Sequence, residues 1–224
     1  MILIFDLDDT LYGESSFVKS GFRAVSEYLY KNYSISASAS FHFMENRLDI
    51  YGRKHVFDTL LSRYGLKTRE NIRKCLSVYR SHKPKIKLYP EANECLKRFQ
   101  NFSIYVVTDG NKLVQRNKAL ALGLYERIKF CYITSCYGLR NSKPSPYCFL
   151  KICEKENVSS QKVVCIGDDP NKDFVGVKPL GFKTVRVLKG RFKDVNKDKA
   201  FEADYHINSL KELTIDFLHN ILSI

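Results

Sequence analysis

Acidic residues follow two short apolar runs of the sequence. Asp6 and Asp8 come directly after the first run, and Asp168 and Asp173 come after a later one. Asp6 and Asp8 point to the same side of an extended backbone, because side chains alternate along a strand. Carboxylates about 4 Å apart repel each other by about 4 kcal/mol per pair at an effective dielectric constant of roughly 20, so a cluster of them needs a cation. An all-oxygen ligand set with open positions favours Mg2+.

Thr108, Asp109 and Lys143 complete the candidate site. Thr108 and Asp109 end another apolar run, and Lys143 directly precedes Pro144. Lys143 supplies a fixed positive charge, and Thr108 with nearby backbone N–H groups can hold phosphate oxygens. We include Asp109 and Lys143 in this phosphate-binding set, although an Asp at a strand end can also form a turn or cap a helix. Together these groups suit phosphoryl transfer.

Short apolar strands alternate with amphipathic helices from about residue 85 onward. This alternation predicts a parallel sheet with helices on both faces, whose ligands bind at the carboxyl ends of the strands. The candidate residues follow these strand ends. The predicted strands are 2–5, 103–107, 130–133, 162–166, 183–187 and 206–207, and the predicted helices are 91–99, 112–122, 144–155, 172–178 and a C-terminal helix.

Residues 13–84 show helical periodicity. Apolar side chains recur three and four positions apart in three segments, near residues 17–28, 56–64 and 72–79. The predicted fold is therefore α/β, with a Rossmann-like parallel sheet formed by residues 1–12 and 85–224 and an inserted all-helical domain.

The composition excludes several classes of protein. The chain has 224 residues, of which 44% are hydrophobic, so it is not disordered, and no apolar run approaches the roughly 20 residues of a membrane span. Seven cysteines without a CxxC pair indicate free thiols in a reducing compartment, with a metal site from the two C-x4-C pairs as the alternative. No signal-peptide pattern follows Met1. We expect a cytoplasmic protein without a membrane partner.

Four motifs together resemble those of the haloacid dehalogenase-like (HAD) hydrolase superfamily. They are Asp6 to Leu11, Val106 to Gly110, Lys143-Pro144 and Gly167 to Asp173, in the order that the family shows. The resemblance implies a HAD-like catalytic core. It also implies that the insertion at 13–84 is a helical first-type cap, which covers the active-site mouth and selects substrates.

The resemblance also implies a role for each matching residue. Asp6 would attack phosphorus and form an aspartyl-phosphate, and Asp8 would protonate the leaving oxygen and later deprotonate water. An acid at the position of Asp8 favours phosphate substrates, because a halide leaving group needs no proton. Thr108 would bind a phosphate oxygen, and Lys143 would neutralise the charge on Asp6 and on the phosphoryl group.

The resemblance gives the Mg2+ site as well. Asp6, the backbone carbonyl of Asp8, and Asp168 would hold the ion. Asp173 and Asp169 compete for the last acidic position, and we rank Asp173 first because the fourth motif of the family has its second acid a few residues downstream.

The sequence therefore predicts a Mg2+-dependent phosphatase that acts on a small phosphorylated metabolite, such as a sugar phosphate or a nucleotide. A phosphomutase with the same nucleophile is the first alternative. The net charge of +13, with +7 of it in residues 13–84, also allows a non-catalytic protein that binds nucleic acid. We favour an anion-attracting cap over nucleic-acid binding, because the sequence contains no nucleic-acid-binding motif. The alternative for the cap is that its Lys and Arg residues only coat the outer helix faces. The sequence makes no prediction of the oligomeric state.

Overall fold

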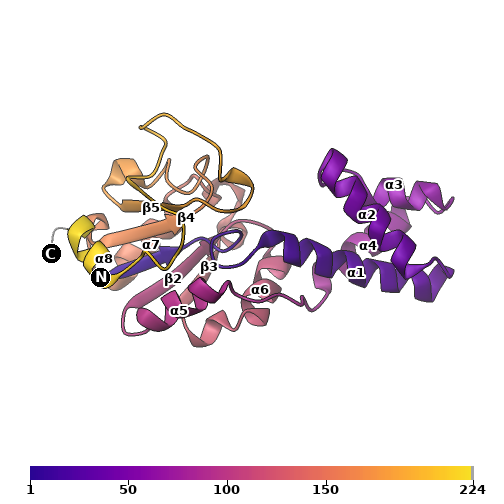
Figure 1. Cartoon of the computed structure of the whole chain (residues 1–224), viewed down its shortest axis with the longest axis horizontal. Helices are drawn as coiled ribbons and strands as arrows, with labels where there is room; N and C mark the ends of the chain where they lie inside the picture. Colours follow the sequence, from indigo (N-terminus) through magenta and orange to yellow (C-terminus); the bar gives the residue numbers. More distant parts are fainter. Residues whose placement is uncertain (223–224) are drawn as a thin grey trace. The chain divides into compact units, whose positions relative to one another are not determined.

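The computed structural model describes residues 1–222, which form two compact units (Figure 1). The first unit contains residues 1–14 and the described residues from 87 onward, and the second contains residues 15–86. We call the first unit the core and the second the helical insertion. The insertion begins and ends two residues later than the predicted range 13–84.

The core is built on a six-stranded parallel sheet with the strand order β3-β2-β1-β4-β5-β6. The chain starts in the middle of the sheet, adds strands on one side and then returns to the other. The order reverses at β1, and β1 and β4 are hydrogen-bonded neighbours. A ligand site is expected at such a reversal point. The strands are β1 (Ile2–Phe5), β2 (Ser103–Thr108), β3 (Phe130–Ile133), β4 (Val163–Gly167), β5 (Lys183–Val187) and β6 (Tyr205–Ile207).

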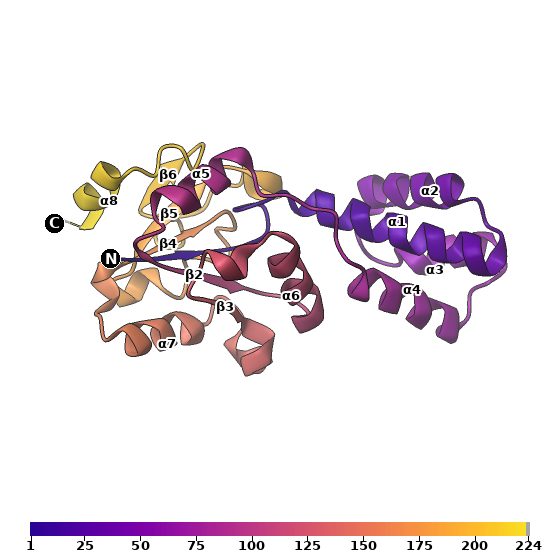
Figure 2. The same ribbon diagram turned by 90° about the horizontal axis from the view of Figure 1, so that it is seen from below.

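Helices cover both faces of this sheet, and Figure 2 shows α5 and α7 on opposite sides of the strands. Their ends follow local signals. Pro90 lies in the first turn of α5, and the side chain of Asn111 accepts hydrogen bonds from two backbone N–H groups at the start of α6. The core helices are α5 (Pro90–Arg98), α6 (Lys112–Ala121), α7 (Tyr147–Glu156) and α8 (Ile215–Leu222).

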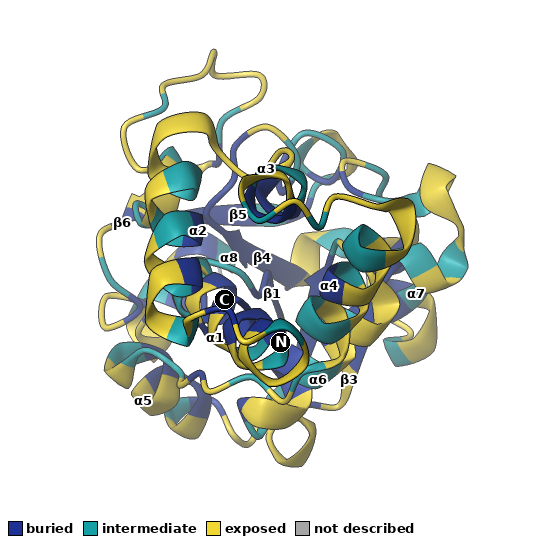
Figure 3. Ribbon diagram, turned by 90° about the vertical axis from the view of Figure 1, so that its right-hand side faces the viewer, coloured by how far each residue is buried: buried dark blue, intermediate teal, exposed yellow. Residues whose placement is uncertain are grey.

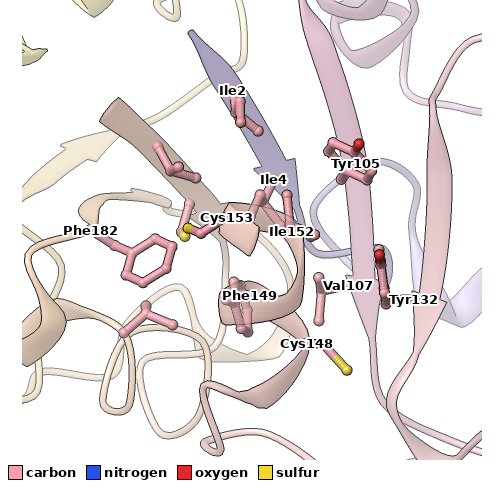
Figure 4. Close-up of a cluster of buried hydrophobic side chains, with 13 residues drawn as sticks. Ile2, Ile4, Tyr105, Val107, Tyr132, Cys148, Phe149, Ile152, Cys153 and Phe182 are labelled. Atoms are coloured by element: carbon pink, nitrogen blue, oxygen red, sulfur yellow. The ribbon is translucent and has the colours of Figure 1, made fainter. Parts of the chain in front are cut away.

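One face of the sheet packs against α7 through a large apolar cluster (Figure 4). Ile2 and Ile4 of β1 contribute to it, as expected for alternate residues of a strand. Phe149 and Ile152 of α7 cover them, and Phe182 closes the cluster before β5. Because nearly all of these side chains are buried, the strand ends that carry the candidate residues have a rigid support.

The segment 172–178 does not form the helix that the sequence predicts. It consists of turns and bends, followed by a short 3-10 helix at Lys178–Leu180. Gly176 lies so close to the carbonyl oxygen of Pro144 that a Cβ atom would overlap it. Asp173 accepts a hydrogen bond from the backbone of Asp169 and pairs with Lys143. These tertiary contacts outweigh the weak helical preference of the segment.

The helical insertion is a four-helix unit with its own apolar core. Val56, Phe57, Leu60 and Leu61 form the buried side of α3, which is dark blue in Figure 3. Thr68 caps α4, because its side-chain oxygen accepts a hydrogen bond from the backbone N–H of Asn71, the third residue of the helix. The helices are α1 (Glu14–Tyr33), α2 (Ala37–Tyr51), α3 (Val56–Arg63) and α4 (Arg69–Ser81).

The chain leaves and re-enters the core through two adjacent segments. The backbone N–H of Tyr89 donates to the carbonyl of Leu11 at 2.9 Å, and the Tyr89 ring lies against Gly13. The two connections therefore touch within the core itself.

The structure also shows the state of the cysteines and the character of the helices. All seven cysteines are free thiols, and Cys136 alone among them is exposed. Among residues 1–222, no helix is both long enough and apolar enough to cross a membrane.

Candidate active site

Three buried carboxylates converge at the carboxyl ends of β1 and β4. Asp6 directly follows β1, and Asp168 and Asp173 lie in the segment after β4. One carboxylate oxygen of each lies within 4.8 Å of the other two. The backbone N–H of Asp6 donates to the carbonyl of Ile166 at 2.8 Å, which extends the pairing of the two strands beyond their ends. The fold thus brings together residues that are more than 150 positions apart in the sequence.

Lys143 places its ammonium group between two of these carboxylates. Its Nζ lies 2.5 Å from Oδ1 of Asp6 and 2.9 Å from Oδ1 of Asp173. The side chain is only 1% exposed. Burial disfavours the charged form, but Asp173 and Asp6 together raise the pKa of Lys143 well above its ordinary value. The site therefore contains a permanent cation.

The ammonium groups of Lys143 and Lys172 do not balance the three buried carboxylates. Burial raises the pKa of Asp6 to about 7, although Lys143 acts in the opposite direction. Burial, followed by the charges of Asp6 and Asp173, raises the pKa of Asp168 to about 9. A divalent cation held by these oxygens would remove the repulsion, so the donor set fits an oxygen-coordinated ion such as Mg2+.

The Asp8 side chain belongs to a second cluster of contacts in the core. Lys118 of α6 lies 2.7 and 2.9 Å from its two carboxylate oxygens. Gln115 donates to Oδ2 at 3.0 Å, and the hydroxyl of Tyr12 donates to Oδ1. Burial raises the pKa of Asp8, but Lys118, Tyr12 and Gln115 outweigh it and lower the pKa below its ordinary value. The carboxylate of Asp8 is therefore held in its ionised form.

Thr108 is connected to the same cluster. Its hydroxyl oxygen accepts a hydrogen bond from Nε2 of Gln115 at 2.5 Å, and the residue is 1% exposed. An oxygen that accepts from Gln115 still has its own O–H group to donate. This geometry suits donation to a phosphate oxygen.

Asp109 has structural contacts in the core. Its Oδ1 accepts a hydrogen bond from the hydroxyl of Thr134 at 2.5 Å and one from the backbone N–H of Lys143 at 3.1 Å. These bonds tie the loop after β2 to the loop that carries Lys143. Asp109 can thus position Lys143. A contact between Asp109 and the substrate phosphate remains a prediction.

Asp169 is engaged in a local turn. Its Oδ1 accepts hydrogen bonds from the backbone N–H of Asn171 at 3.0 Å and from the side chain of Asn171 at 2.8 Å. Lys172 lies 3.7 Å from its other oxygen. The backbone N–H of Asp169 donates to Asp173, so this turn orients the carboxylate that joins the three-residue cluster.

Three residues that hold Asp8 were not among the predicted site residues, namely Tyr12, Gln115 and Lys118. A signal for two of them was present. Gln115 and Lys118 are three positions apart, next to Ala119, so all three lie on one face of the predicted helix 112–122. Long polar side chains on the face that packs on a sheet need buried partners. That requirement marks them as candidates for contact with an acidic group.

Comparisons with known proteins agree with the chemistry that this geometry suggests. The family model of haloacid dehalogenase-like hydrolases matches residues 1–181. A glyceraldehyde 3-phosphate phosphatase of Methanocaldococcus jannaschii is 30% identical over 228 residues, which cover 98% of this chain and 97% of that protein. A phosphoserine phosphatase of Thermus thermophilus is 26% identical, and the match covers 72% of this chain and 63% of that protein.

Solved structures share the fold. A HAD phosphatase from Thermococcus onnurineus has a TM-score of 0.60 at 23% identity, with 99% of this chain and 97% of that chain covered. A 2-haloacid dehalogenase from Pseudomonas syringae pv. Tomato has a TM-score of 0.65 at 20% identity, with 99% and 97% covered. The match to the family model spans most of the chain, and the full-length relative reaches 30% identity. The chain belongs to the haloacid dehalogenase-like hydrolase family.

Proposed function

We propose that this protein is a Mg2+-dependent phosphatase that hydrolyses a small phosphomonoester through an aspartyl-phosphate at Asp6. The observation that carries the proposal is the position of the Asp6 carboxylate. It lies beside the Lys143 ammonium group and within 4.8 Å of two further carboxylates, with Asp8 two residues later on the same loop. A nucleophile, a fixed cation, a set of metal ligands and an acid–base group are thus available in one core.

The residues that would hold Mg2+ are Asp6, Asp168 and Asp173, together with the backbone carbonyl of Asp8. The raised pKa values of Asp6 and Asp168 support this assignment, because these carboxylates lack sufficient positive charge around them. When bound, the ion would neutralise the carboxylates and the phosphate oxygens, so that an anionic nucleophile can approach an anionic substrate.

In the first step, a carboxylate oxygen of Asp6 forms a bond to phosphorus while the bond from phosphorus to the ester oxygen breaks. Asp8 donates a proton to the departing oxygen, which leaves as an alcohol. Lys143 stabilises the charge that develops on the phosphoryl group, and the hydroxyl of Thr108 donates to one of its oxygens. Asp8 has to be protonated for this step, so its ion pair with Lys118 has to loosen when substrate is bound.

In the second step, water attacks phosphorus and the bond between phosphorus and the Asp6 oxygen breaks. Asp8 accepts a proton from that water, and phosphate leaves with Asp6 restored. The contacts of Asp8 with Lys118, Tyr12 and Gln115 favour the ionised form that this step requires. The two steps divide one difficult displacement into two easier ones.

The similar proteins support a small substrate. Their names refer to phosphatases of glyceraldehyde 3-phosphate and of phosphoserine, and both of these compounds are small phosphomonoesters. We therefore propose a small phosphorylated metabolite as the substrate class and hydrolysis as the reaction.

The test is a screen of phosphorylated metabolites for release of phosphate in the presence of Mg2+. Glyceraldehyde 3-phosphate and phosphoserine belong in the first set. We expect phosphate and the free alcohol in equal amounts, and we expect Asp6→Asn to abolish turnover. Asp216→Asn on α8 is the matched control, because it makes the same chemical change at an exposed position of the core. Turnover that survives Asp6→Asn would refute the mechanism.

Asp8→Asn separates the two steps. Nitrophenyl phosphate has a leaving group that departs without a proton, so the first step should survive in this variant while hydrolysis of the aspartyl-phosphate slows. Mass spectrometry of the intact protein should then detect one added phosphoryl group. If Asp8→Asn accumulates no phosphorylated protein and still turns over at the normal rate, Asp8 is not the acid–base group.

A further inference from the structure

The helical insertion contains a cavity of its own, with a volume of about 250 Å3. All the residues that line it come from the insertion. Its apolar wall is formed by side chains of α1, α3 and α4. Ile72 and Leu76, one helical turn apart on α4, are only partly buried there, as is Tyr79 on the next turn. The cavity is therefore an apolar recess that the four-helix unit leaves open.

The aromatic wall of this cavity is held in place by its neighbours. The Tyr79 ring packs against the backbone of α1 at Gly21, where a Cβ atom would overlap the ring. Its centroid lies 5.7 Å from that of Phe57 and 6.1 Å from that of Phe22. Since a glycine and two rings fix Tyr79, the recess has a defined shape.

The remaining lining residues give the cavity a basic rim. Arg53 and Arg80 are exposed and stand on different segments, the turn before α3 and the end of α4. His55 and Asp58 also line the cavity and lie 4.0 Å from each other. Two guanidinium groups and one carboxylate thus line the edge of an apolar recess.

We propose that this recess, which we call the insertion pocket, binds a small organic anion that has an apolar body. The carboxylate or phosphate of the ligand would lie at Arg53 and Arg80, and its aromatic or branched aliphatic part would contact Ile72, Leu76 and Tyr79. The volume is suitable, since an apolar cavity of about 150 Å3 is enough for benzene. A pocket with an apolar wall and a few convergent polar groups is the usual form of a small-molecule site.

The test measures binding to the full-length protein by calorimetry, with phenylpropionate as the probe. Phenylpropanol has the same ring without the charge, and propionate has the charge without the ring. We expect saturable binding of phenylpropionate at one site, and binding at least about tenfold weaker for each of the other two compounds. No saturable binding of phenylpropionate, or equal affinity for phenylpropanol, would overturn the proposal.

Variants assign the binding to the pocket. Arg53→Gln with Arg80→Gln should weaken binding of phenylpropionate at least about tenfold. The matched control is Arg69→Gln with Arg73→Gln, which removes two exposed arginines of the insertion that do not line the pocket. Equal weakening in both double variants would reduce the effect to general charge attraction and overturn the proposal. Leu76→Trp should fill the recess and abolish binding.

This measurement needs no turnover, so it can fail or succeed independently of the proposed phosphatase reaction. Inhibition kinetics then identify the source of the ligand. Competitive inhibition of phosphate release by phenylpropionate assigns the pocket to the leaving group of the substrate. Binding of phenylpropionate that leaves the KM for the phosphorylated substrate unchanged assigns the pocket to a separate ligand. Both results support a binding site in the insertion.

Discussion

Lys143 is the residue on which the balance of charge in the acidic cluster depends. It is buried between Asp6 and Asp173, and Asp168, which accepts a hydrogen bond from the hydroxyl of Thr10, lies close by. Removing one member of a buried ion pair leaves an uncompensated charge and costs about 3–5 kcal/mol. The residue thus serves stability and the proposed reaction at the same time.

We predict that Lys143→Met lowers both activity and stability. The rate of phosphate release should fall by at least about 100-fold, since a donor aimed at the developing charge is lost. The midpoint of thermal unfolding should fall in metal-free buffer and recover in part when Mg2+ is added. Lys162→Met is the control, because Lys162 is exposed on the core. A variant with an unchanged midpoint in both buffers would contradict the charge balance described for the cluster.

The acidic cluster also predicts a dependence of stability on pH. The pKa values of Asp6 and Asp168, about 7 and about 9, exceed the ordinary value of 3.8, so the folded protein binds more protons than the unfolded chain between pH 4 and 9. Stability from these groups is complete below about pH 4 and is lost as the pH rises through 7 and 9. Each group changes the free energy of unfolding by about 1.4 kcal/mol per pH unit in its window.

Chemical denaturation from pH 5 to pH 9, with chelator and with Mg2+, measures this effect. In chelator, the free energy of unfolding should fall more steeply with pH than it does in Mg2+. Asp168→Asn should reduce the slope in chelator, because the variant has no proton to lose at that position. If the slope is the same with and without Mg2+, the ion does not bind to these carboxylates.

At the residue scale, the sequence predicted the cluster but not its surroundings. Asp6, Asp168 and Asp173 could be predicted because each follows a strand, and parallel strands end at one edge. The contacts of Lys118 and Gln115 with Asp8 span more than 100 positions. They depend on the rotation of α6 about its axis, which the helical period alone does not determine.

Strands and helices could be predicted where their own side chains decide the structure. The apolar runs at β1 and β3 were predicted with the observed bounds. The segment 172–178 was predicted wrongly, because its structure depends on partners elsewhere in the chain. Asp173 is held by Lys143, and Gly176 lies against Pro144. These tertiary contacts determine the structure of the segment, and its local helical preference does not.

We predict that Gly176→Ala destabilises the protein and lowers its activity. The added methyl group would overlap the carbonyl of Pro144, and overpacking of this kind costs about 1–3 kcal/mol. For a chain of this size, each kcal/mol lowers the unfolding midpoint by about 2–4 °C. Activity should fall as well, because the same segment carries Asp173. Gly123→Asn is the control, since Gly123 has open space around it and a left-handed backbone that Asn tolerates.

The whole molecule is basic, although its proposed reaction centre is acidic. The net charge of +13 is spread over both units, and Arg47, Arg53 and Lys54 lie in one short stretch of the insertion. Such a charge raises the rate at which anions reach a protein at low ionic strength, and salt screens it over about 8 Å at physiological strength.

We predict that kcat/KM for a phosphorylated substrate falls as salt is raised. Replacing Arg47, Arg53 and Lys54 by Gln should lower kcat/KM at low salt and reduce its dependence on salt. Steady-state kinetics at several ionic strengths, with kcat and KM determined separately, would measure both. A value of kcat/KM that is unchanged at low salt would show that these cations do not attract the substrate.

The hydrogen bond between Tyr89 and Leu11 joins the two places where the chain leaves and re-enters the core. We expect the sheet to close without the 72 residues of the insertion, because this hydrogen bond already joins the core segments on either side of it. The insertion is thus modular: a gene with a short flexible linker in place of residues 15–86 should encode a smaller protein with the same six-stranded sheet. The acidic cluster of such a protein should stay where the strands hold it.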